Sequence, residues 1–253
     1  MAAPDQIAQV AAALRRVCGE GLLALYLHGS AAGGGLRPQS DLDVLAVLDR
    51  AMSDAQRRAL LAALLPLSGR HPAPPGGPRS VEVMVFAQSA LSRHDAQAEF
   101  VYGEWLRDSF ESGTVPAPAT DPDHLLVLAQ ARRRAIPLLG PDPREILPEI
   151  SPRQVRHAMR DALPALLDGL QGDERNTLLT LARMWHTART GRFADKDAAA
   201  GWAIARLDRA DAALLDAARQ AYLGEGRDDW RGREAEVRRA ADSLRLHVMA
   251  ALA

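Results

Sequence analysis

The sequence of 253 residues predicts an α+β protein with two domains: an N-terminal domain built on a mixed sheet with helices, and a C-terminal all-α helical bundle. Two patterns favour this class. Helical and strand-like patterns alternate from the N-terminus to Phe86, whereas from Arg153 onward the apolar spacing is helical throughout. Residues 139–152 are spaced by prolines, so we place the boundary near residue 150 and expect domains 1–150 and 151–253.

The composition excludes several classes of protein. The formal net charge is −1, so no global field draws the chain to nucleic acid or to a membrane. No apolar run approaches the roughly 20 residues that span a bilayer, and Met1–Val10 lacks the basic and apolar regions of a secretory signal. Cys18 is the single cysteine, which rules out an internal disulfide. We therefore expect a cytoplasmic monomer without a nucleic-acid or membrane partner.

The N-terminal domain begins with a helical pattern. Ile7, Val10, Leu14 and Val17 recur at helical spacing before Gly19. Short apolar runs bounded by turn residues then predict buried strands. The expected elements are a strand at 22–27, a glycine-rich turn at 31–40, a strand at 41–48, a helix at 54–67, a loop at 71–78, a strand at 81–86 and a helix at 122–139. No further strand is predicted after Phe86.

The C-terminal domain is predicted to consist of five helices. Glycine, which favours helix ends, occurs at the breaks between them. The expected helices are about 153–168, 173–190, 195–207, 209–223 and 229–252, and the glycines at the breaks are Gly169, Gly172, Gly191 and Gly224.

A Gly-Ser turn and an Asp-x-Asp pair carry the chemistry of the sequence. The apolar run Leu25–Leu27 ends in His-Gly-Ser, and ten residues separate Ser30 from Asp41-Leu-Asp43. Residues i and i+2 of a strand project to the same face, so Asp41 and Asp43 converge on one point. Two such carboxylates repel each other unless a cation lies between them, and magnesium (Mg²⁺) commonly joins one or two carboxylates to substrate phosphates.

The turn before this pair suits an anion. Gly29 allows backbone amides to approach a phosphate, and Ser30 adds a hydroxyl donor. Each motif alone is typical of an ordinary turn or a solvated strand end. Their combination between two apolar strands is more specific, because unpaired carboxylates beside a core cost several kcal/mol. Together they predict phosphoryl or nucleotidyl transfer.

This pattern is that of the DNA polymerase β-like nucleotidyltransferase superfamily, and the whole chain resembles the streptomycin/spectinomycin adenylyltransferases. The matching stretches occur in both expected domains, which makes the combined resemblance strong. His28 departs from it, since that family usually carries tyrosine there. The matching stretches are 27–31, 34–38, 40–43, 81–83, 103–107, 172–176, 179–183, 195–199 and 221–224.

The resemblance implies an N-terminal nucleotidyltransferase domain and a helical bundle that completes the cleft for ATP and the antibiotic. Ser30, Ser40, Asp41 and Asp43 would hold the nucleotide phosphates and Mg²⁺, and Glu82 matches the catalytic base. The remaining matches are nucleotide contacts at Asp123, Arg183 and Lys196, and antibiotic contacts at Glu82, Trp105 and Asp173.

Several of these residues have other interpretations. Glu82 alternates with Val81 and Val83, as an ordinary solvent-facing glutamate would, and it is also a candidate third metal ligand. A general base must lie beside the acceptor hydroxyl. Trp105 fits either the core or a flat surface against a cyclitol ring, with its indole N–H free to donate.

Two further candidates lie at predicted helix starts. Asp173, like Glu174, is placed to cap a helix N-terminus. Lys196 is in the first turn of a helix, where a cation is unfavourable. It is the single lysine among 31 basic residues. A compact ammonium approaches a phosphate end-on, so either a nucleotide contact or chance retention explains it.

We therefore expect AMP transfer from ATP to a hydroxyl of an aminocyclitol antibiotic. The alternatives are a nucleotidyltransferase of the same fold acting on a protein or tRNA, and a nucleotide-binding regulator without turnover. Members of the family that modify both drugs carry a tryptophan and an aspartate shortly before Gly-Asp-Glu-Arg. Residues 163–171 contain no aromatic residue, although Asp168 is a candidate for the aspartate. The resemblance therefore favours spectinomycin 9-OH over streptomycin 3''-OH.

Overall fold

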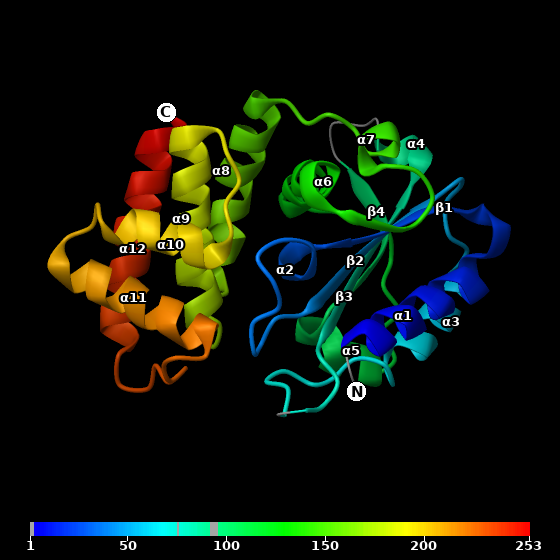
Figure 1. The fold of residues 1–253 in the computed structure, drawn as a ribbon, viewed down its shortest axis with the longest axis horizontal. Helices are drawn as coiled ribbons and strands as arrows, with labels where there is room; N and C mark the ends of the chain where they lie inside the picture. Colours follow the sequence, from blue (N-terminus) through cyan, green and yellow to red (C-terminus); the bar gives the residue numbers. More distant parts are fainter. Residues whose placement is uncertain (1–2, 75, 92–95) are drawn as a thin grey trace. The chain divides into compact units, whose positions relative to one another are not determined.

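The computed structural model of the chain describes residues 3–74, 76–91 and 96–253. It divides into two compact units, Met1–Ile150 (unit 1) and Ser151–Ala253 (unit 2), whose elements are labelled in Figure 1. None of the described helices is both long and apolar enough to cross a bilayer.

Unit 1 is built on one six-stranded sheet with the order β5-β4-β3-β2-β1-β6. β2 and β3 run parallel, whereas the other neighbouring strands are antiparallel. Its elements are α1 (Ala3–Cys18), η1 (Gly19–Gly21), β1 (Leu22–His28), α2 (Gly29–Ala32), β2 (Leu42–Leu48), α3 (Asp54–Leu64), β3 (Val81–Ala87), α4 (Gln88–Leu91), β4 (Gln97–Tyr102), η2 (Glu104–Leu106), α5 (Arg107–Glu111), β5 (Ala119–Thr120), α6 (Pro122–Arg134), β6 (Ile136–Leu139) and α7 (Pro143–Ile146).

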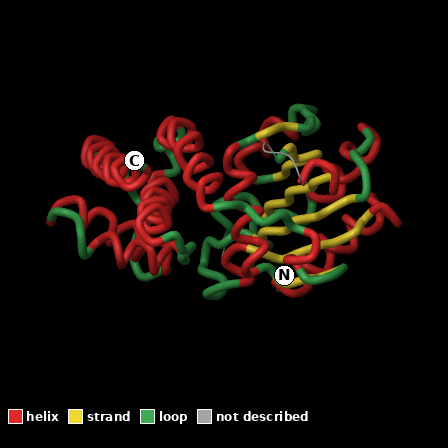
Figure 2. Tube along the Cα trace, turned by 90° about the horizontal axis from the view of Figure 1, so that it is seen from above, coloured by secondary structure: helices red, strands yellow, loops and turns green. Residues whose placement is uncertain are grey.

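Helices cover both faces of this sheet, as Figure 2 shows for the strands of unit 1. Alternate residues of β1 divide between the faces, because successive side chains of a strand point to opposite sides. Leu25 and Leu27 belong to the core under α1 and α3, and Ala24 and Tyr26 belong to the core under α6. The sheet is therefore a buried central layer.

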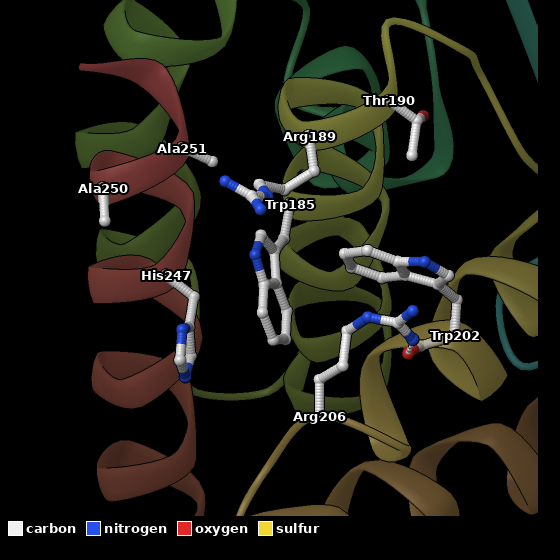
Figure 3. Close-up of a pocket in the computed structure, with 8 residues that line it drawn as sticks. All are labelled: Trp185, Arg189, Thr190, Trp202, Arg206, His247, Ala250 and Ala251. Atoms are coloured by element: carbon white, nitrogen blue, oxygen red, sulfur yellow. Dashed lines mark hydrogen bonds between the residues drawn. The ribbon is translucent and has the colours of Figure 1, made fainter.

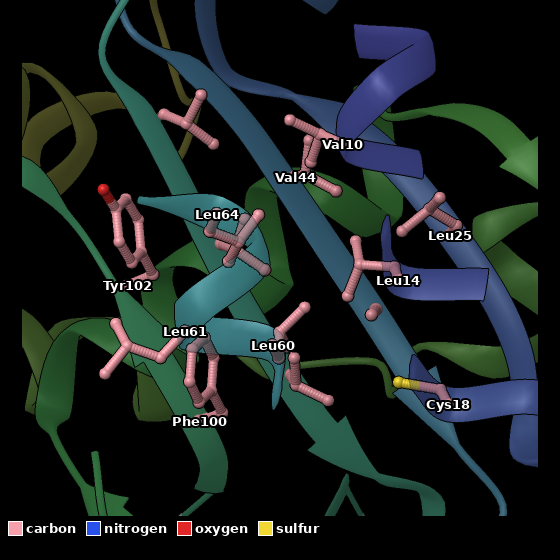
Figure 4. Close-up of a cluster of buried hydrophobic side chains, with 14 of the residues drawn as sticks. Val10, Leu14, Cys18, Leu25, Val44, Leu60, Leu61, Leu64, Phe100 and Tyr102 are labelled. Atoms are coloured by element: carbon pink, nitrogen blue, oxygen red, sulfur yellow. The ribbon is translucent and has the colours of Figure 1, made fainter. Parts of the chain in front are cut away.

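The core beneath α1 and α3 combines helix and strand side chains (Figure 4). Val10 and Leu14 of α1 and Leu60 and Leu64 of α3 are each fully buried against the sheet. Burial of one such side chain stabilises the fold by about 1.5–3 kcal/mol. α3 begins after a capping box in which the Ser53 hydroxyl accepts from the Gln56 N–H.

Three strands after Phe86 were not predicted. β4 contains a buried charged residue, Glu99, whose carboxylate accepts the Met52 N–H at 3.0 Å and lies 3.7 Å from the guanidinium of Arg57. This interrupts the apolar pattern of a strand. β5 has only two residues, and β6 is an edge strand that contains Pro137. β4 and β5 lack the apolar run on which a strand prediction depends, and in β6 a proline interrupts it.

Other boundaries also differ from the prediction. The helix predicted for 122–139 ends at Arg134, because Pro137 disfavours helical backbone in the preceding residue and has no N–H to continue the ladder. α3 ends at Leu64 and not at residue 67, and the predicted glycine-rich turn begins within the short helix α2. The predicted linker contains α7, which Asp142 and Glu145 start with a capping box.

Unit 2 is a bundle of the five predicted helices. α9 packs against each of the other four, and Gly191 and Gly224 end α9 and α11 in the left-handed conformation that glycine favours. The last helix begins five residues later than predicted. The helices are α8 (Pro152–Asp168), α9 (Glu174–Thr190), α10 (Lys196–Ile204), α11 (Arg209–Leu223) and α12 (Glu234–Leu252).

Candidate active site

Three carboxylates share one face of the sheet in unit 1. The Leu42 N–H donates to Ser80 O at 2.9 Å, so the extended chain of β2 already starts beside Asp41. Asp43 is the register partner of Glu82 on β3, and paired residues project to the same face. All three carboxylates are half-buried between apolar neighbours of the core. Asp43 and Glu82 therefore leave the sheet side by side, and Asp41 precedes Asp43 by two residues at the start of the strand.

The Gly-Ser turn packs directly on this group. Gly29 has a φ of +62°, and a Cβ atom built on it would lie 1.8 Å from Asp43 Oδ2. A side chain at residue 29 would therefore displace the carboxylate. Ser30 follows in α2, and its carbonyl accepts the N–H groups of Gly33 and Gly35 at 3.3 and 3.1 Å. Only glycine at residue 29 allows the backbone so close to the aspartate.

Ser40 and Arg79 hold residues 37–40, the segment that leads from the Gly-Ser turn to β2. Arg79 was not predicted as a site residue. The buried Ser40 hydroxyl accepts the Arg37 N–H at 2.9 Å. The Arg79 guanidinium donates to the carbonyls of Arg37 and Ser40, both at 2.8 Å. Arg79 therefore fixes the segment that leads into Asp41. No sequence signal identifies it, because arginine is abundant throughout the chain.

His28 lies opposite Asp43 in the antiparallel register of β1 and β2. Its imidazole is buried, and burial lowers the pKa of His28 from the ordinary 6.5 to about 4. The ring is therefore neutral near pH 7 and adds no positive charge beside Asp43. Its Nε2 is buried and has no hydrogen-bond partner among the residues that the structure describes.

Trp105 is exposed and is not a core residue. It lies in η2 after β4 with 62% of its surface accessible, and its ring packs on Gly103, where a Cβ atom would lie 2.1 Å from the indole. The neighbouring Glu104 is held inward, since its carboxylate accepts from the Tyr102 hydroxyl at 3.0 Å and from Arg107 at 2.9 Å. This arrangement leaves the flat indole exposed at the surface of unit 1.

Asp123 lies in the first turn of α6. It is exposed, and its backbone N–H donates to the N-cap residue Asp121 at 2.8 Å. α6 covers the sheet face from which Asp43 and Glu82 project. Asp123 therefore lies on the same side of the sheet as Asp43 and Glu82.

In unit 2, a polar chain connects Lys196 to Asp173. Lys196 Nζ donates to Asn176 Oδ1 at 3.3 Å, and Asn176 Nδ2 donates to Asp173 Oδ1 at 2.8 Å. The Tyr222 ring centroid lies 5.8 Å from Lys196 Nζ. Asn176 and Tyr222 were not predicted as site residues. Both belong to stretches that match the family, 172–176 and 221–224, and this is the feature of the sequence that could have identified them.

The two interpretations of Asp173 are separated by its contacts. Its side chain makes no hydrogen bond to the backbone of α9, whereas the Glu174 carboxylate accepts the Gly172 N–H at 3.0 Å. Asp173 therefore does not serve as a side-chain cap. Arg183 is half-buried and follows Asn176 by seven residues, so both lie on one face of α9, about 10 Å apart along the helix axis.

Comparison with known proteins agrees with this arrangement. The chain superposes with a TM-score of 0.93, at 30% identity, on the crystal structure of spectinomycin adenyltransferase AAD(9) from Enterococcus faecalis with ATP and spectinomycin, covering 97% of this chain and 99% of that one. A mixed sheet with a Gly-Ser turn and two aspartates at the start of β2, followed by a helical bundle, defines a nucleotidyltransferase, an enzyme. The predicted fold class is thereby confirmed.

Sequence relatives identify the family within this class. The chain is 42% identical over 237 residues to the spectinomycin 9-adenylyltransferase of Staphylococcus aureus, covering 93% of this chain and 91% of that protein. It is 35% identical over 230 residues to the aminoglycoside (3'') (9) adenylyltransferase of Escherichia coli, covering 88% of this chain and 86% of that protein. Residues 145–247 match the family model for the C-terminal domain of aminoglycoside adenylyltransferase. The chain belongs to the aminoglycoside adenylyltransferase family, which confirms the resemblance.

Proposed function

We propose that this enzyme transfers AMP from ATP to a hydroxyl of an aminocyclitol or aminoglycoside antibiotic, with the 9-OH of spectinomycin as the favoured acceptor. The observation that carries the proposal is the group of Asp41, Asp43 and Glu82 on one sheet face, against the turn at Gly29. A relative of the same fold has been crystallised with ATP and spectinomycin. Modification of the antibiotic would confer resistance to it.

Asp41 and Asp43 suit a magnesium ion. Their carboxylates lie on one face, and oxygen ligands are what this cation prefers. No set of three His, Cys, Asp or Glu side chains within the described ranges is arranged to hold a metal by itself. The remaining ligands would then be nucleotide phosphate oxygens and water. Mg²⁺ would neutralise the triphosphate and so make its α-phosphorus accessible to an incoming oxygen.

Glu82 is the proposed general base. Its carboxylate accepts the proton of the acceptor hydroxyl, the acceptor oxygen forms a bond to the α-phosphorus, and the bond from that phosphorus to the bridging oxygen breaks, releasing pyrophosphate. Its place on β3, one strand away from Asp43, supports a role beside the metal pair. A third metal ligand is the alternative role, which calorimetry of ATP binding distinguishes.

The other candidate residues divide into nucleotide and antibiotic contacts. Lys196, Arg183 and Asp123 would contact the nucleotide, as would the backbone and hydroxyl of Gly29, Ser30 and Ser40. The contact between Lys196 and Asn176 holds the ammonium at the start of α10, which supports a role toward phosphate.

The antibiotic is a cation with a fused-ring body, and two side chains suit it. Trp105 offers a flat apolar surface that is 62% exposed, and a cyclitol ring stacks well on such a surface. Asp173 offers a carboxylate whose Oδ1 is oriented by Asn176. Each would bind the acceptor and not the nucleotide.

Mass spectrometry of spectinomycin incubated with the protein, ATP and Mg²⁺ tests the proposal. A mass gain of one AMP, lost when ATP is omitted or a chelator is present, is the expected result. An unchanged antibiotic mass at high enzyme concentration would overturn the proposed function.

A further inference from the structure

Unit 2 contains a cavity of about 510 Å³ that the proposed function does not use. It lies where the C-terminal ends of α9, α10 and α12 meet. Trp185 on its wall follows Asn176 by nine residues, about 13 Å along α9, so the cavity is separate from the contact between Asn176 and Lys196. Its volume falls within the range of small-molecule sites. The residues lining it are Trp185, Arg189, Thr190, Trp202, Arg206, His247, Ala250 and Ala251.

A row of aromatic rings forms one wall. Trp185 stacks on His247, with ring centroids 4.2 Å apart and planes 15° apart. The same indole meets Trp202 edge-on at 5.0 Å and 76°. Figure 3 shows Trp185 between the other two rings. Because Trp185 is only 6% exposed, the row is held by packing, and the half-buried Trp202 and His247 provide most of its accessible ring surface.

Two guanidinium groups lie on either side of this row (Figure 3). Arg206 lies 4.2 Å from the centroid of the Trp202 ring, and its Nη1 donates to Trp202 O at 2.6 Å. Arg189 projects from the last turn of α9. Among the described residues that line the cavity there is no aspartate or glutamate. The wall therefore combines aromatic surface with uncompensated positive charge.

The helix ends at the cavity do not cancel this charge. The C-terminal carbonyls of a helix carry partial negative charge, which would repel an anion. Here Arg156 donates to Ala188 O of α9 at 3.0 Å and to Ala251 O of α12 at 2.7 Å, and Arg160 donates to Leu252 O at 2.8 Å. These arginines compensate the two helix ends, so Arg189 and Arg206 determine the charge that a ligand meets.

We propose that this cavity binds a small planar aromatic anion, of the class of aromatic carboxylates and aromatic phosphates. A planar ring would pack against the half-buried Trp202 and His247, and a guanidinium fork matches the paired oxygens of a carboxylate or phosphate. A cationic aminocyclitol is disfavoured, because the cavity offers it two arginines and no carboxylate. The inference stands apart from antibiotic modification and does not depend on it.

Calorimetry with 1-naphthoate, 1-naphthyl phosphate and the neutral 1-naphthamide tests the proposal on the full-length protein. Saturable binding of at least one anion, and weaker binding of the amide, are expected. The double variant Arg189→Gln/Arg206→Gln should weaken anion binding by about tenfold or more, because charge-assisted hydrogen bonds are lost. Tighter binding of the phosphate than of the carboxylate would identify a phosphorylated ligand, and the reverse order a carboxylate.

Three control variants locate the site. Arg238→Gln removes an exposed arginine of α12 outside the cavity and should leave the affinity unchanged. Lys196→Ala, at the candidate nucleotide contact, should also leave it unchanged. Arg206→Gln alone should weaken binding less than the double variant does. The proposal is overturned if neither anion binds at millimolar concentration, if the amide binds equally well, if the double variant binds like the wild type, or if Lys196→Ala abolishes binding.

Discussion

Asp43 of β2 and Glu82 of β3 are partners in the parallel register of the sheet, so their carboxylates leave it on the same face. Their surroundings differ. The backbone of Gly29 packs against the carboxylate of Asp43, where a Cβ atom would come within 1.8 Å of Oδ2, whereas Glu82 lies one strand farther from the turn. These different surroundings suit the two proposed tasks, which are binding of Mg²⁺ by Asp43 and acceptance of a proton by Glu82.

Replacing Asp43 should remove transfer without unfolding the protein. Asparagine keeps the shape of the side chain beside Gly29 but loses the charge proposed to hold Mg²⁺. We expect AMP transfer to spectinomycin to fall by at least about 10²-fold, while the circular dichroism spectrum and Tm stay close to those of the wild type. Initial rates of pyrophosphate release measure the effect. Near-wild-type turnover of Asp43→Asn, or of the native enzyme in excess chelator, would disprove the metal assignment.

Replacing Glu82 should separate binding from chemistry. Glu82→Gln preserves size and hydrogen bonding but cannot accept the proton of the acceptor hydroxyl. The expected result is unchanged affinity for ATP and antibiotic with at least the roughly 10²-fold loss of kcat that is typical of a lost general base. Isothermal titration calorimetry provides the control, because loss of ATP binding would identify Glu82 as a metal ligand.

The central part of this arrangement could be predicted from the sequence. Asp41 and Asp43 are two residues apart in one apolar run, and Glu82 alternates with valines that the structure buries in the core on the other face. Local periodicity therefore decides on which face each carboxylate lies. The short apolar runs of β1, β2 and β3 were recognisable for the same reason, since both of their faces are covered by helices.

What the sequence could not predict depends on contacts between distant residues. Arg79 reaches the carbonyls of Arg37 and Ser40 across about forty positions of the chain, and nothing distinguishes it locally from other arginines. β4 was missed because Glu99 interrupts its apolar pattern, and this charge is acceptable only where Met52 and Arg57 contact it. Tertiary contacts override the local pattern in both cases.

His28 should make stability depend on pH. Its pKa in the folded protein is about 4, below the ordinary 6.5, so between these values the unfolded chain binds a proton that the folded protein does not. The stability that the protein gains from keeping His28 neutral is fully present above about pH 6.5 and is lost as the pH falls toward 4. Between about pH 7.5 and 5, the free energy of unfolding of the wild type should decrease by about 2 kcal/mol more than that of His28→Phe. Urea denaturation at both pH values measures this difference, and parallel pH profiles of the two proteins would contradict it.

Cys18 should be unreactive in the folded protein. Burial on the core-facing side of α1 raises the pKa of its thiol to about 11, and the side chain is 7% exposed. At about pH 8 almost no thiolate forms, and the thiolate is the reactive species. We expect a thiol reagent such as iodoacetamide to modify the native enzyme at least about 10²-fold more slowly than the enzyme in urea. Rapid labelling of native protein, with activity retained, would show that the thiol is accessible.

The acceptor preference should follow from the end of α8. The family members that modify both drugs carry a tryptophan and an aspartate before Gly-Asp-Glu-Arg, and here that stretch ends α8 with no aromatic residue. Leu163 is buried in the bundle, Leu166 and Leu167 are half-buried, and Asp168 is exposed. Streptomycin is the larger and more flexible drug, so it should lose most from a missing stacking surface, which is worth about 0.5–1.5 kcal/mol beyond burial.

Spectinomycin is compact, and we expect the proposed contacts of Trp105, Glu82 and Asp173 to be enough to hold it. We therefore expect kcat/KM for spectinomycin to exceed that for streptomycin by about tenfold or more, a difference of about 1.4 kcal/mol. The relative at 42% identity is a spectinomycin 9-adenylyltransferase, and the one at 35% is named for both positions. The more similar of these two relatives is thus the one named for spectinomycin alone, as the expected preference requires. Steady-state kinetics with each drug under the same conditions decides the matter. Similar values, or a preference for streptomycin, would mean that aliphatic packing by Leu166 or Leu167 replaces the aromatic contact and that this stretch does not determine specificity.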